Sequence, residues 1–374
     1  MGKLSKERRG MLLNVGFIVL TLLLVLFLVS RAGDPAQVVG ALRRINPAWL
    51  LAALGCLVTH ILLEGYSLRV FFRFQGVRVT MAACTLVGLM GMFYSNVTPA
   101  ATGGQPMQAY ALRKRGVAFG TGYSALAVKF FCWQCALLLT GAVMWAFHEP
   151  FVRRMLGGAV WFAALGFLLN SMMVVLVILL AINRNFVRAI IIFLVNIAHR
   201  VRLVKDKAAT SSRLDAALND FHSSVNLLTG HPMQFLALFL LALMQVSAMM
   251  SVIYAVYRGF GLARYGYSEL ITIQFMLYIA ASFTPLPGAS GAQEGGFYLF
   301  FRGFFPEVTI FAALLVWRFF TYYLFILLGF GAVAIDQSYS MRRARLNMRL
   351  DHVGDEPPVP GRKTGETLKA GEDG

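Results

Sequence analysis

Long uninterrupted apolar runs, separated by short polar segments, dominate the pattern along the chain. A helix rises 1.5 Å per residue, so about 20 apolar residues cross the hydrocarbon core of a bilayer. A membrane β-barrel would instead need short segments of alternating polarity. The pattern therefore predicts an all-α polytopic membrane protein with about eight transmembrane helices. The predicted helices cover residues 11–30, 48–68, 81–96, 118–147, 158–182, 233–257, 267–283 and 308–335.

Two of these runs are short, and each is followed by a break rich in proline and glycine. The runs 81–96 and 267–283 hold about 16 residues each, which is short for a full crossing. Proline and glycine end helices, and short helical stretches follow at 103–114 and 291–303. The sequence thus predicts two re-entrant helix hairpins, which enter the membrane and return to the same side. The residues of the two breaks are Asn96, Pro99, Pro285, Pro287 and Gly288.

The two breaks form an internal repeat. Both contain Thr-Pro, at residues 98–99 and 284–285, and both continue with a capping-box pattern, Thr102-x-x-Gln105 and Ser290-x-x-Gln293. A cation follows each pattern at nearly equal spacing, Lys129 in the first half and Arg318 in the second. Three predicted helices separate the hairpins, so the hairpins enter from opposite sides. Residues 10–147 and 158–335 are therefore predicted to be halves of an inverted repeat.

Composition and charge fit this interpretation. The chain has 58% hydrophobic and only 14% charged residues, whereas soluble domains have about a quarter charged, which excludes a soluble globular enzyme. The net charge of +17 does not indicate nucleic acid as a partner, because the basic residues lie mostly between the apolar runs. With a cytoplasmic N-terminus, 24 Lys and Arg fall on the cytoplasmic side and 8 outside. The positive-inside rule then predicts that both termini of this multi-pass protein of the cytoplasmic (inner) membrane are cytoplasmic.

The domain organisation follows from the same pattern. Residues 1–335 are predicted to form one transmembrane domain. It contains a cytoplasmic insert at 184–231, in which residues 211–228 have the apolar spacing of an amphipathic helix. Residues 336–374 are predicted to form a basic juxtamembrane segment and a disordered cytoplasmic tail.

The chemistry that stands out is positive charge at mid-membrane. Lys129 and Arg318 lie near the centres of their predicted helices, where insertion of a cation costs roughly 2.5–3.5 kcal/mol. The N-termini of the half-helices, at Gly103 and Gly291, would add N–H donors and positive dipole ends. Together they predict a positively charged midplane cavity for an anion. The candidate lipid- or anion-binding residues are Lys129, Arg318, Thr102, Gly103, Gly104, Gln105, Gln108, Tyr110, Ser290, Gly291, Gln293 and Glu294.

Alternatives remain open for several of these residues. Arg318 could instead form a structural pair with Glu294, and the glycines could serve turns and helix packing. Glu294 could also receive a proton and couple transport to pH. Two further patterns are weak: the spacing of Cys132 and Cys135 is more typical of helix packing than of redox chemistry, and His60 with Glu64 lacks the further ligands of a metal site. The sequence predicts no catalytic residue, no metal and no cofactor.

The two broken segments resemble a known family. Asn96-Val-Thr-Pro, Gly103-Gly-Gln-Pro and Tyr110-Ala-Leu-Arg-Lys-Arg-Gly, paired with Phe283-Thr-Pro-Leu-Pro-Gly and Gly291-Ala-Gln-Glu, are similar to motifs of the lysylphosphatidylglycerol synthase transmembrane family. This is the flippase-like membrane domain of MprF and of stand-alone YbhN-like and hopanoid-associated proteins. In MprF a soluble aminoacyl-transfer domain follows, whereas this chain stops about 40 residues after its last predicted helix. The resemblance therefore implies the flippase activity without the synthase activity.

The expected function is a flippase-like transporter, not an enzyme. It would move an anionic phospholipid, or a polyprenyl- or hopanoid-type lipid, between leaflets through the positively charged cavity. One alternative is a membrane-embedded transferase acting on a lipid-linked substrate, since archaeal relatives have been tied to polyprenyl-linked sugar transfer. A second alternative is a secondary transporter of a small anion. The expected partner is a membrane lipid, and a homo-oligomer and a separate lipid-synthesising enzyme remain open.

Overall fold

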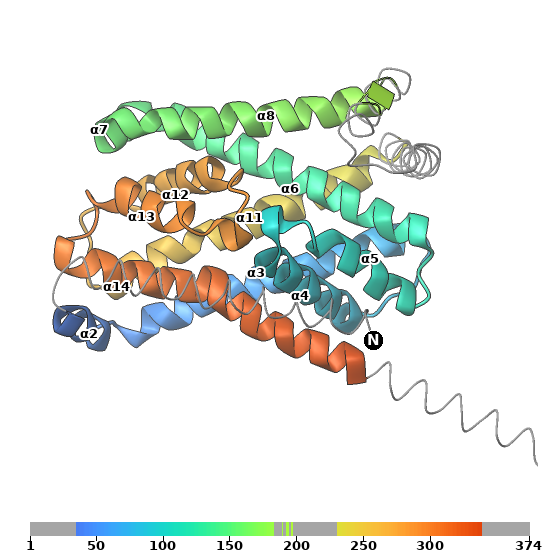
Figure 1. Ribbon diagram of the computed structural model, residues 1–374, viewed down its shortest axis with the longest axis horizontal. Coiled ribbons are helices and arrows are strands. Elements are labelled where there is room, and N and C mark those ends of the chain that lie inside the picture. Colours follow the sequence, from blue (N-terminus) through green and yellow to red (C-terminus); the bar gives the residue numbers. More distant parts are fainter. Residues whose placement is uncertain (1–34, 183–188, 190–191, 194–195, 197–229, 339–374) are drawn as a thin grey trace, which may run out of the picture. The chain divides into compact units, whose positions relative to one another are not determined.

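The computed structural model describes residues 35–182, 189, 192–193, 196 and 230–338. In this part of the chain every regular element is a helix (Figure 1). The α-helices are α2 (Pro35–Arg43), α3 (Pro47–Phe74), α4 (Met81–Val97), α5 (Gly104–Lys114), α6 (Phe119–Phe147), α7 (Glu149–Leu156), α8 (Val160–Ile182), α11 (Pro232–Gly259), α12 (Tyr267–Ala281), α13 (Ala292–Phe301) and α14 (Glu307–Arg318). Short 3₁₀ turns are η1 (Pro99–Ala101), η2 (Gly157–Ala159) and η3 (Pro287–Ala289), and a π-helical turn, η4 (Phe319–Tyr323), follows α14.

The helices begin where the local sequence provides caps. The Asn46 side chain accepts a hydrogen bond from the Ala48 N–H at 2.9 Å, and Pro47 occupies the first position of α3. Thr80 Oγ1 accepts from the Ala83 N–H at 3.3 Å and caps α4. These side chains satisfy donors that a helix start leaves unpaired.

Seven of the eight predicted transmembrane helices are present at nearly the predicted positions. The eighth, 11–30, lies outside the described residues, as do the tail from 339 onward and nearly all of the insert 184–231. Two short helices, α2 and α7, were not predicted. Their apolar residues have helical spacing, since Val38 and Leu42 are four apart, as are Val152 and Leu156, but both segments are too short to cross a membrane.

The helix lengths agree with a multi-pass membrane protein. In the described part of the chain, five helices are long and apolar enough to cross a bilayer. The apolar helices α4 and α12 have 17 and 15 residues, so they extend only about 26 and 23 Å at 1.5 Å per residue. Both are shorter than the roughly 30 Å hydrocarbon core.

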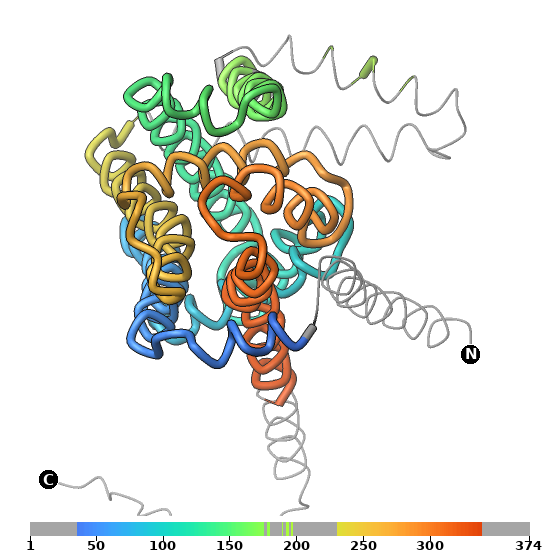
Figure 2. The backbone as a smooth tube through the Cα atoms, turned by 90° about the vertical axis from the view of Figure 1, so that its left-hand side faces the viewer, coloured from blue at the N-terminus to red at the C-terminus, as the bar shows by residue number. Residues whose placement is uncertain are grey.

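Each short helix is followed by a break and a second short helix, which gives two helix hairpins, α4–η1–α5 and α12–η3–α13. α5 packs on both α4 and α6, whereas α12 packs on α8, and α13 packs on α14. The second hairpin therefore lies between α8 and α14, as both views show (Figures 1 and 2). α11 packs along α3.

The tips of the two hairpins meet. The Ala100 N–H of η1 donates a hydrogen bond to the Pro285 carbonyl at 3.0 Å. Ala100 and Gly288 both adopt left-handed backbone conformations, with φ of 50° and 60°, one residue after Pro99 and Pro287 respectively. The structural repeat thus aligns Pro99 with Pro287, two residues later than the Thr-Pro dipeptides would suggest. Thr102 is then equivalent to Ser290, as the capping-box alignment predicted.

The chain divides into two units, Met1–Ala332 and Val333–Gly374. All helices and hairpins named above belong to the first unit. Of the second unit, residues 333–338 are described, and they are helical.

We predict that the hairpin tip tolerates no side chain at Gly288. A Cβ atom there would overlap the Tyr322 ring, and the backbone has a φ of 60°. Gly288→Ala should lower the free energy of unfolding by at least about 1–3 kcal/mol, the usual cost of overpacking, measured as a lower melting temperature in detergent. Gly295→Ala is the matched control, because nothing lies within 4 Å of its Cβ position, and it should melt at or above the wild-type temperature. Equal melting of the two variants would contradict the prediction.

Candidate functional site

A polar cavity of about 600 Å³ lies between the two hairpins and helices α3, α6 and α11. Its walls carry an unusual set of polar side chains for the interior of an apolar bundle. These are His60, Glu64, Ser95, Asn96, Gln105, Gln108, Lys129, Gln134, Asn170, Gln245, Gln274, Tyr278, Ser282, Thr284, Gln293, Arg318 and Thr321. Because unpaired polar groups are costly in a membrane interior, the arrangement of their partners defines the site.

The Glu64 carboxylate is the centre of a network that joins four helices. Its Oε1 pairs with Lys129 Nζ of α6 and accepts a hydrogen bond from Gln108 Nε2 of α5 at 3.3 Å. Its Oε2 accepts from Gln245 Nε2 of α11 at 2.8 Å. One turn earlier on α3, His60 Nδ1 lies 3.2 Å from the Gln245 carbonyl. Glu64 therefore has a cation and two amide donors as partners.

Two glycines of α4 make room for this network. A Cβ atom at Gly88 would lie 2.7 Å from Cγ of Glu64, and one at Gly91 would overlap the Gln108 side chain. The absence of side chains at these positions allows the polar groups of α3 and α5 to approach the α4 backbone.

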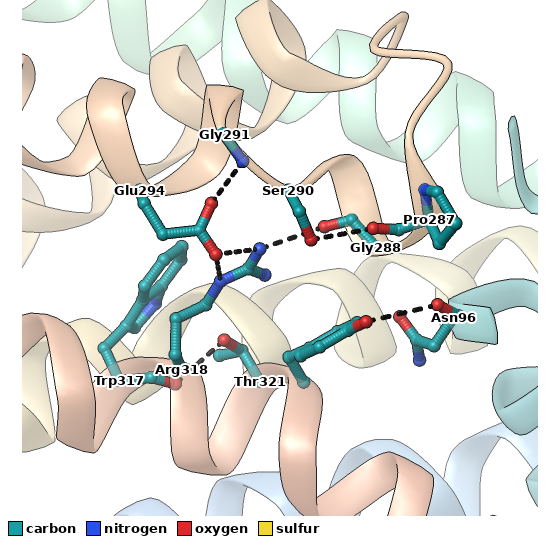
Figure 3. Close-up of polar contacts among 10 residues, drawn as sticks. Asn96, Pro287, Gly288, Ser290, Gly291, Glu294, Trp317, Arg318 and Thr321 are labelled. Atoms are coloured by element: carbon teal, nitrogen blue, oxygen red, sulfur yellow. Dashed lines mark hydrogen bonds and ion pairs between the residues drawn. The ribbon is translucent and has the colours of Figure 1, made fainter. Parts of the chain in front are cut away.

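Arg318 forms an ion pair with Glu294, which is the structural alternative that the sequence left open (Figure 3). Arg318 Nε and Nη2 each lie 2.6 Å from Glu294 Oε1, and Nη2 also donates to the Gly288 carbonyl at 3.1 Å. Glu294 Oε2 accepts from the Gly291 N–H at 2.6 Å. The Arg318 guanidinium lies 4.8 Å from the centre of the Tyr322 ring. The pair therefore holds the tip and the half-helix of the second hairpin on α14.

The two ion pairs reduce the positive charge predicted for the cavity. Lys129 and Arg318 each have a carboxylate partner, so each pair is balanced in formal charge. The pairs differ in access: the side chains of Lys129 and Glu64 are 16% and 10% exposed, those of Arg318 and Glu294 only 4% and 1%. Lys129, Glu64 and Arg318 line the cavity, whereas Glu294 does not belong to its lining.

The predicted capping boxes are also wrong. Thr102 Oγ1 and Ser290 Oγ do not cap a helix but donate to the carbonyls of the prolines three residues earlier, Pro99 and Pro287, at 2.9 and 2.8 Å. The N–H groups at the half-helix starts have partners within their own hairpins. Gly103 donates to Thr98 Oγ1 at 2.9 Å, and Gly291 donates to Glu294. These two N–H groups therefore donate to the protein itself and not, as the sequence predicted, to an anion.

The other candidate residues divide into two groups. Gln105, Gln108 and Gln293 line the cavity together with the two cations. Gln105 and Gln293 occupy equivalent positions, six residues after Pro99 and Pro287. The remaining candidates are not part of the cavity lining: Thr102, Gly103, Gly104, Tyr110, Ser290, Gly291 and Glu294. Tyr110 is 52% exposed, and the Lys114 ammonium lies over its ring, 4.7 Å from the ring centre.

Sequence reasoning missed part of the lining. The Asn170 side chain of α8 donates to Ser282 Oγ at 2.8 Å and accepts from Gln134 Nε2 of α6. Neither Asn170 nor Gln245 was a candidate, although a carboxamide side chain within a long apolar run could have indicated a buried polar site. Glu64 was not among the predicted binding residues, because the sequence could not show that Lys129 lies beside it.

The structure thus defines a class: a multi-pass α-helical membrane protein with two broken hairpins that meet beside a polar cavity. Comparison with known proteins agrees with this. Residues 12–329 match the family described as the lysylphosphatidylglycerol synthase TM region. The chain belongs to this family, which implies a role related to membrane lipids.

Two archaeal proteins are similar over most of their lengths. A UPF0104 membrane protein of Archaeoglobus fulgidus is 25% identical over 303 residues, which cover 79% of this chain and 88% of that protein. A UPF0104 membrane protein of Methanothermobacter thermautotrophicus is 23% identical over 350 residues, or 88% and 95% of the two chains.

We predict that Arg318 is needed for folding because of Glu294. Arg318→Gln leaves a carboxylate that is 1% exposed without its cation, and breaking a buried pair this way costs about 3–5 kcal/mol. The double variant Arg318→Gln, Glu294→Gln should recover most of this loss, since an amide oxygen can still accept from the Gly291 N–H. The measurement is the melting temperature of the single and double variants in one detergent.

The control for this cycle is the exposed pair of Arg153 and Glu149 on α7. Arg153→Gln should cost less than about 1 kcal/mol, as surface pairs do. An Arg318→Gln variant as stable as wild type would contradict a structural role for the pair.

Proposed function

We propose that the protein is a flippase-like transporter that moves an anionic lipid between leaflets, with the headgroup passing through the polar cavity. The observation that carries this proposal is the position of the cavity. Charged and amide side chains line part of it, and it lies within a bundle of membrane-length apolar helices, at the meeting point of two broken hairpins. A transporter for a lipid needs a polar route of this kind, because a charged headgroup cannot enter hydrocarbon unaccompanied.

The rim of the cavity suits a lipid better than a soluble ion. Phe283 and Leu286, beside the second hairpin tip, line the cavity and are 44% and 45% exposed. Ala100 and Ala101 of the first tip also line it and are exposed. Such an apolar rim would allow acyl chains to stay in the bilayer while the headgroup occupies the cavity.

Lys129 is the group proposed to bind the headgroup. Its ammonium has three N–H donors, so it can hold a phosphate oxygen beside Glu64. It is also the more accessible of the two paired cations. Gln105 and Gln293, one from each hairpin, would add neutral hydrogen bonds to the headgroup.

The proposed membrane topology has the N- and C-termini in the cytoplasm of the cell and the two hairpins re-entrant from opposite sides. The short lengths of α4 and α12 and the meeting of the tips support this arrangement. It would give the two halves the inverted orientation found in many transporters.

The function is tested in proteoliposomes with fluorescent lipids whose outer-leaflet label is bleached by dithionite. Wild type should move labelled phosphatidylglycerol well above the rate of empty liposomes. The double variant Lys129→Gln, Glu64→Gln, which removes both charges of the pair together, should be at least about tenfold slower. A charge-assisted hydrogen bond contributes about 1.5–3 kcal/mol, and 1.4 kcal/mol is a factor of ten.

The matched control is Arg153→Gln, Glu149→Gln, which removes an exposed ion pair from α7 and should transport like wild type. Wild-type rates no higher than those of empty liposomes would refute lipid transport. Uptake of radiolabelled phosphate without lipid movement would instead favour the small-anion transporter.

The topology is tested with single cysteines at four exposed arginines that flank the hairpins, in a background without native cysteines. If the hairpins are re-entrant, residues before and after each hairpin lie on one side. A membrane-impermeant maleimide should therefore label Arg264→Cys and Arg302→Cys in intact cells, but Arg78→Cys and Arg113→Cys only after permeabilisation. Labelling of Arg78→Cys and Arg113→Cys from opposite sides would show that α4–α5 crosses the membrane.

A further inference from the structure

The two carboxylates of the midplane differ in whether a ligand can reach them. Glu294 is fixed by Arg318 on one oxygen and by the Gly291 N–H on the other, and it does not belong to the cavity lining. Glu64 lines the cavity, and its cation, Lys129, is the more accessible one. An anion that enters the cavity therefore meets the Lys129–Glu64 pair.

Charge balance limits what can happen next. The pair has no net formal charge before a ligand enters. A headgroup with one negative charge would place two anions around one ammonium and leave a net negative charge inside an apolar bundle. Burial of an uncompensated charge is costly, and a like charge nearby favours the protonated form of a carboxyl group. Binding of one proton would restore neutrality.

We propose that Glu64 is a proton-coupling site, so that one proton accompanies each anionic headgroup through the cavity. This inference rests on the proposed lipid transport and names its energy source, a proton gradient. It assigns the coupling to Glu64 rather than to Glu294, the residue that the sequence suggested.

Glu64 is the carboxylate that the headgroup would displace from Lys129, whereas His60 contacts the Gln245 carbonyl instead, so we assign the proton to Glu64. The titratable or charged groups that line the cavity are His60, Glu64, Lys129, Tyr278 and Arg318. Lys129 is the cation that must stay charged to hold the phosphate. Apart from Lys129, the groups of other helices that contact Glu64 are neutral, namely Gly88 of α4, Gln108 of α5 and Gln245 of α11.

The exchange balances in atoms and charge. On binding, a phosphate oxygen of the headgroup takes the place of Glu64 Oε1 at the Lys129 ammonium, and a proton from water binds the Glu64 carboxylate. On release, the phosphate leaves, the proton returns to water on the side to which the cavity is then open, and the ion pair forms again. The amides of Gln108 and Gln245 can serve both states, because each offers an N–H donor and a carbonyl acceptor.

A pH difference across proteoliposomes tests the coupling. With the membrane potential clamped by valinomycin and equal potassium, a difference of one pH unit should enrich labelled phosphatidylglycerol in the leaflet on the alkaline side. One-to-one coupling sustains a ratio of up to about tenfold, whichever way the protein is inserted. Glu64→Gln should show a ratio near one, whatever its absolute rate. Glu149→Gln, which removes an exposed carboxylate from an ion pair on α7, should keep the wild-type ratio.

The outcomes separate this proposal from the proposed function. Lipid movement in wild type with a leaflet ratio near one, or an unchanged ratio in Glu64→Gln, would overturn proton coupling and leave lipid transport standing. No movement by wild type would overturn both. Loss of the ratio in Glu149→Gln would overturn the assignment to Glu64.

A second measurement uses wild-type protein alone. In unbuffered detergent solution with a pH indicator, binding of short-chain phosphatidylglycerol should take up close to one proton per lipid bound. Short-chain phosphatidylcholine, which has no net charge, should take up none. Calorimetrically detected binding of phosphatidylglycerol without proton uptake would contradict the proposal.

Discussion

The structure depends on one constraint: a charge inside an apolar bundle must have a partner there. The Lys129–Glu64 pair meets this constraint between α3 and α6, and the amides of Gln108 and Gln245 extend it to α5 and α11. Four helices, α3, α5, α6 and α11, are thereby tied to one carboxylate. The glycines of α4 at positions 88 and 91 matter for the same reason, since side chains there would displace the network.

The two hairpins share the turn that follows the proline but use different chemistry. Each has a proline, a left-handed residue and a hydroxyl that bonds back to the proline carbonyl, and a half-helix follows. In the second hairpin a carboxylate of the half-helix holds the cation of α14, whereas in the first half the carboxylate partner of Lys129 comes from α3. The repeat therefore places equivalent cations in two sites with unequal access. This inequality is the physical basis for giving one pair a structural role and the other a role with the ligand.

The two halves contact each other through the hairpin tips and the helices next to them. Within these elements the π-helical turn directly after Arg318 is notable. Such turns insert an extra residue into a helix and occur often at functional sites. Here it contains Tyr322, which packs at the Gly288 tip and donates to the Asn96 carbonyl of the first hairpin at 3.4 Å. One helix thereby contacts both breaks.

The sequence by itself determined the long apolar helices and the two breaks. Apolar length alone was enough to place seven described helices, and Pro99, Pro287 and the glycines after them marked both hairpins, because these residues act on their own backbone. It also singled out Lys129 and Arg318, because a cation within a long apolar run is costly whatever its partner. Only the tertiary structure decided what each cation meets. Glu64 lies 65 residues before Lys129, and Asn170 and Gln245 reach the cavity from other helices. Ion pairs and shared hydrogen bonds depend on how helices pack, which local periodicity does not specify.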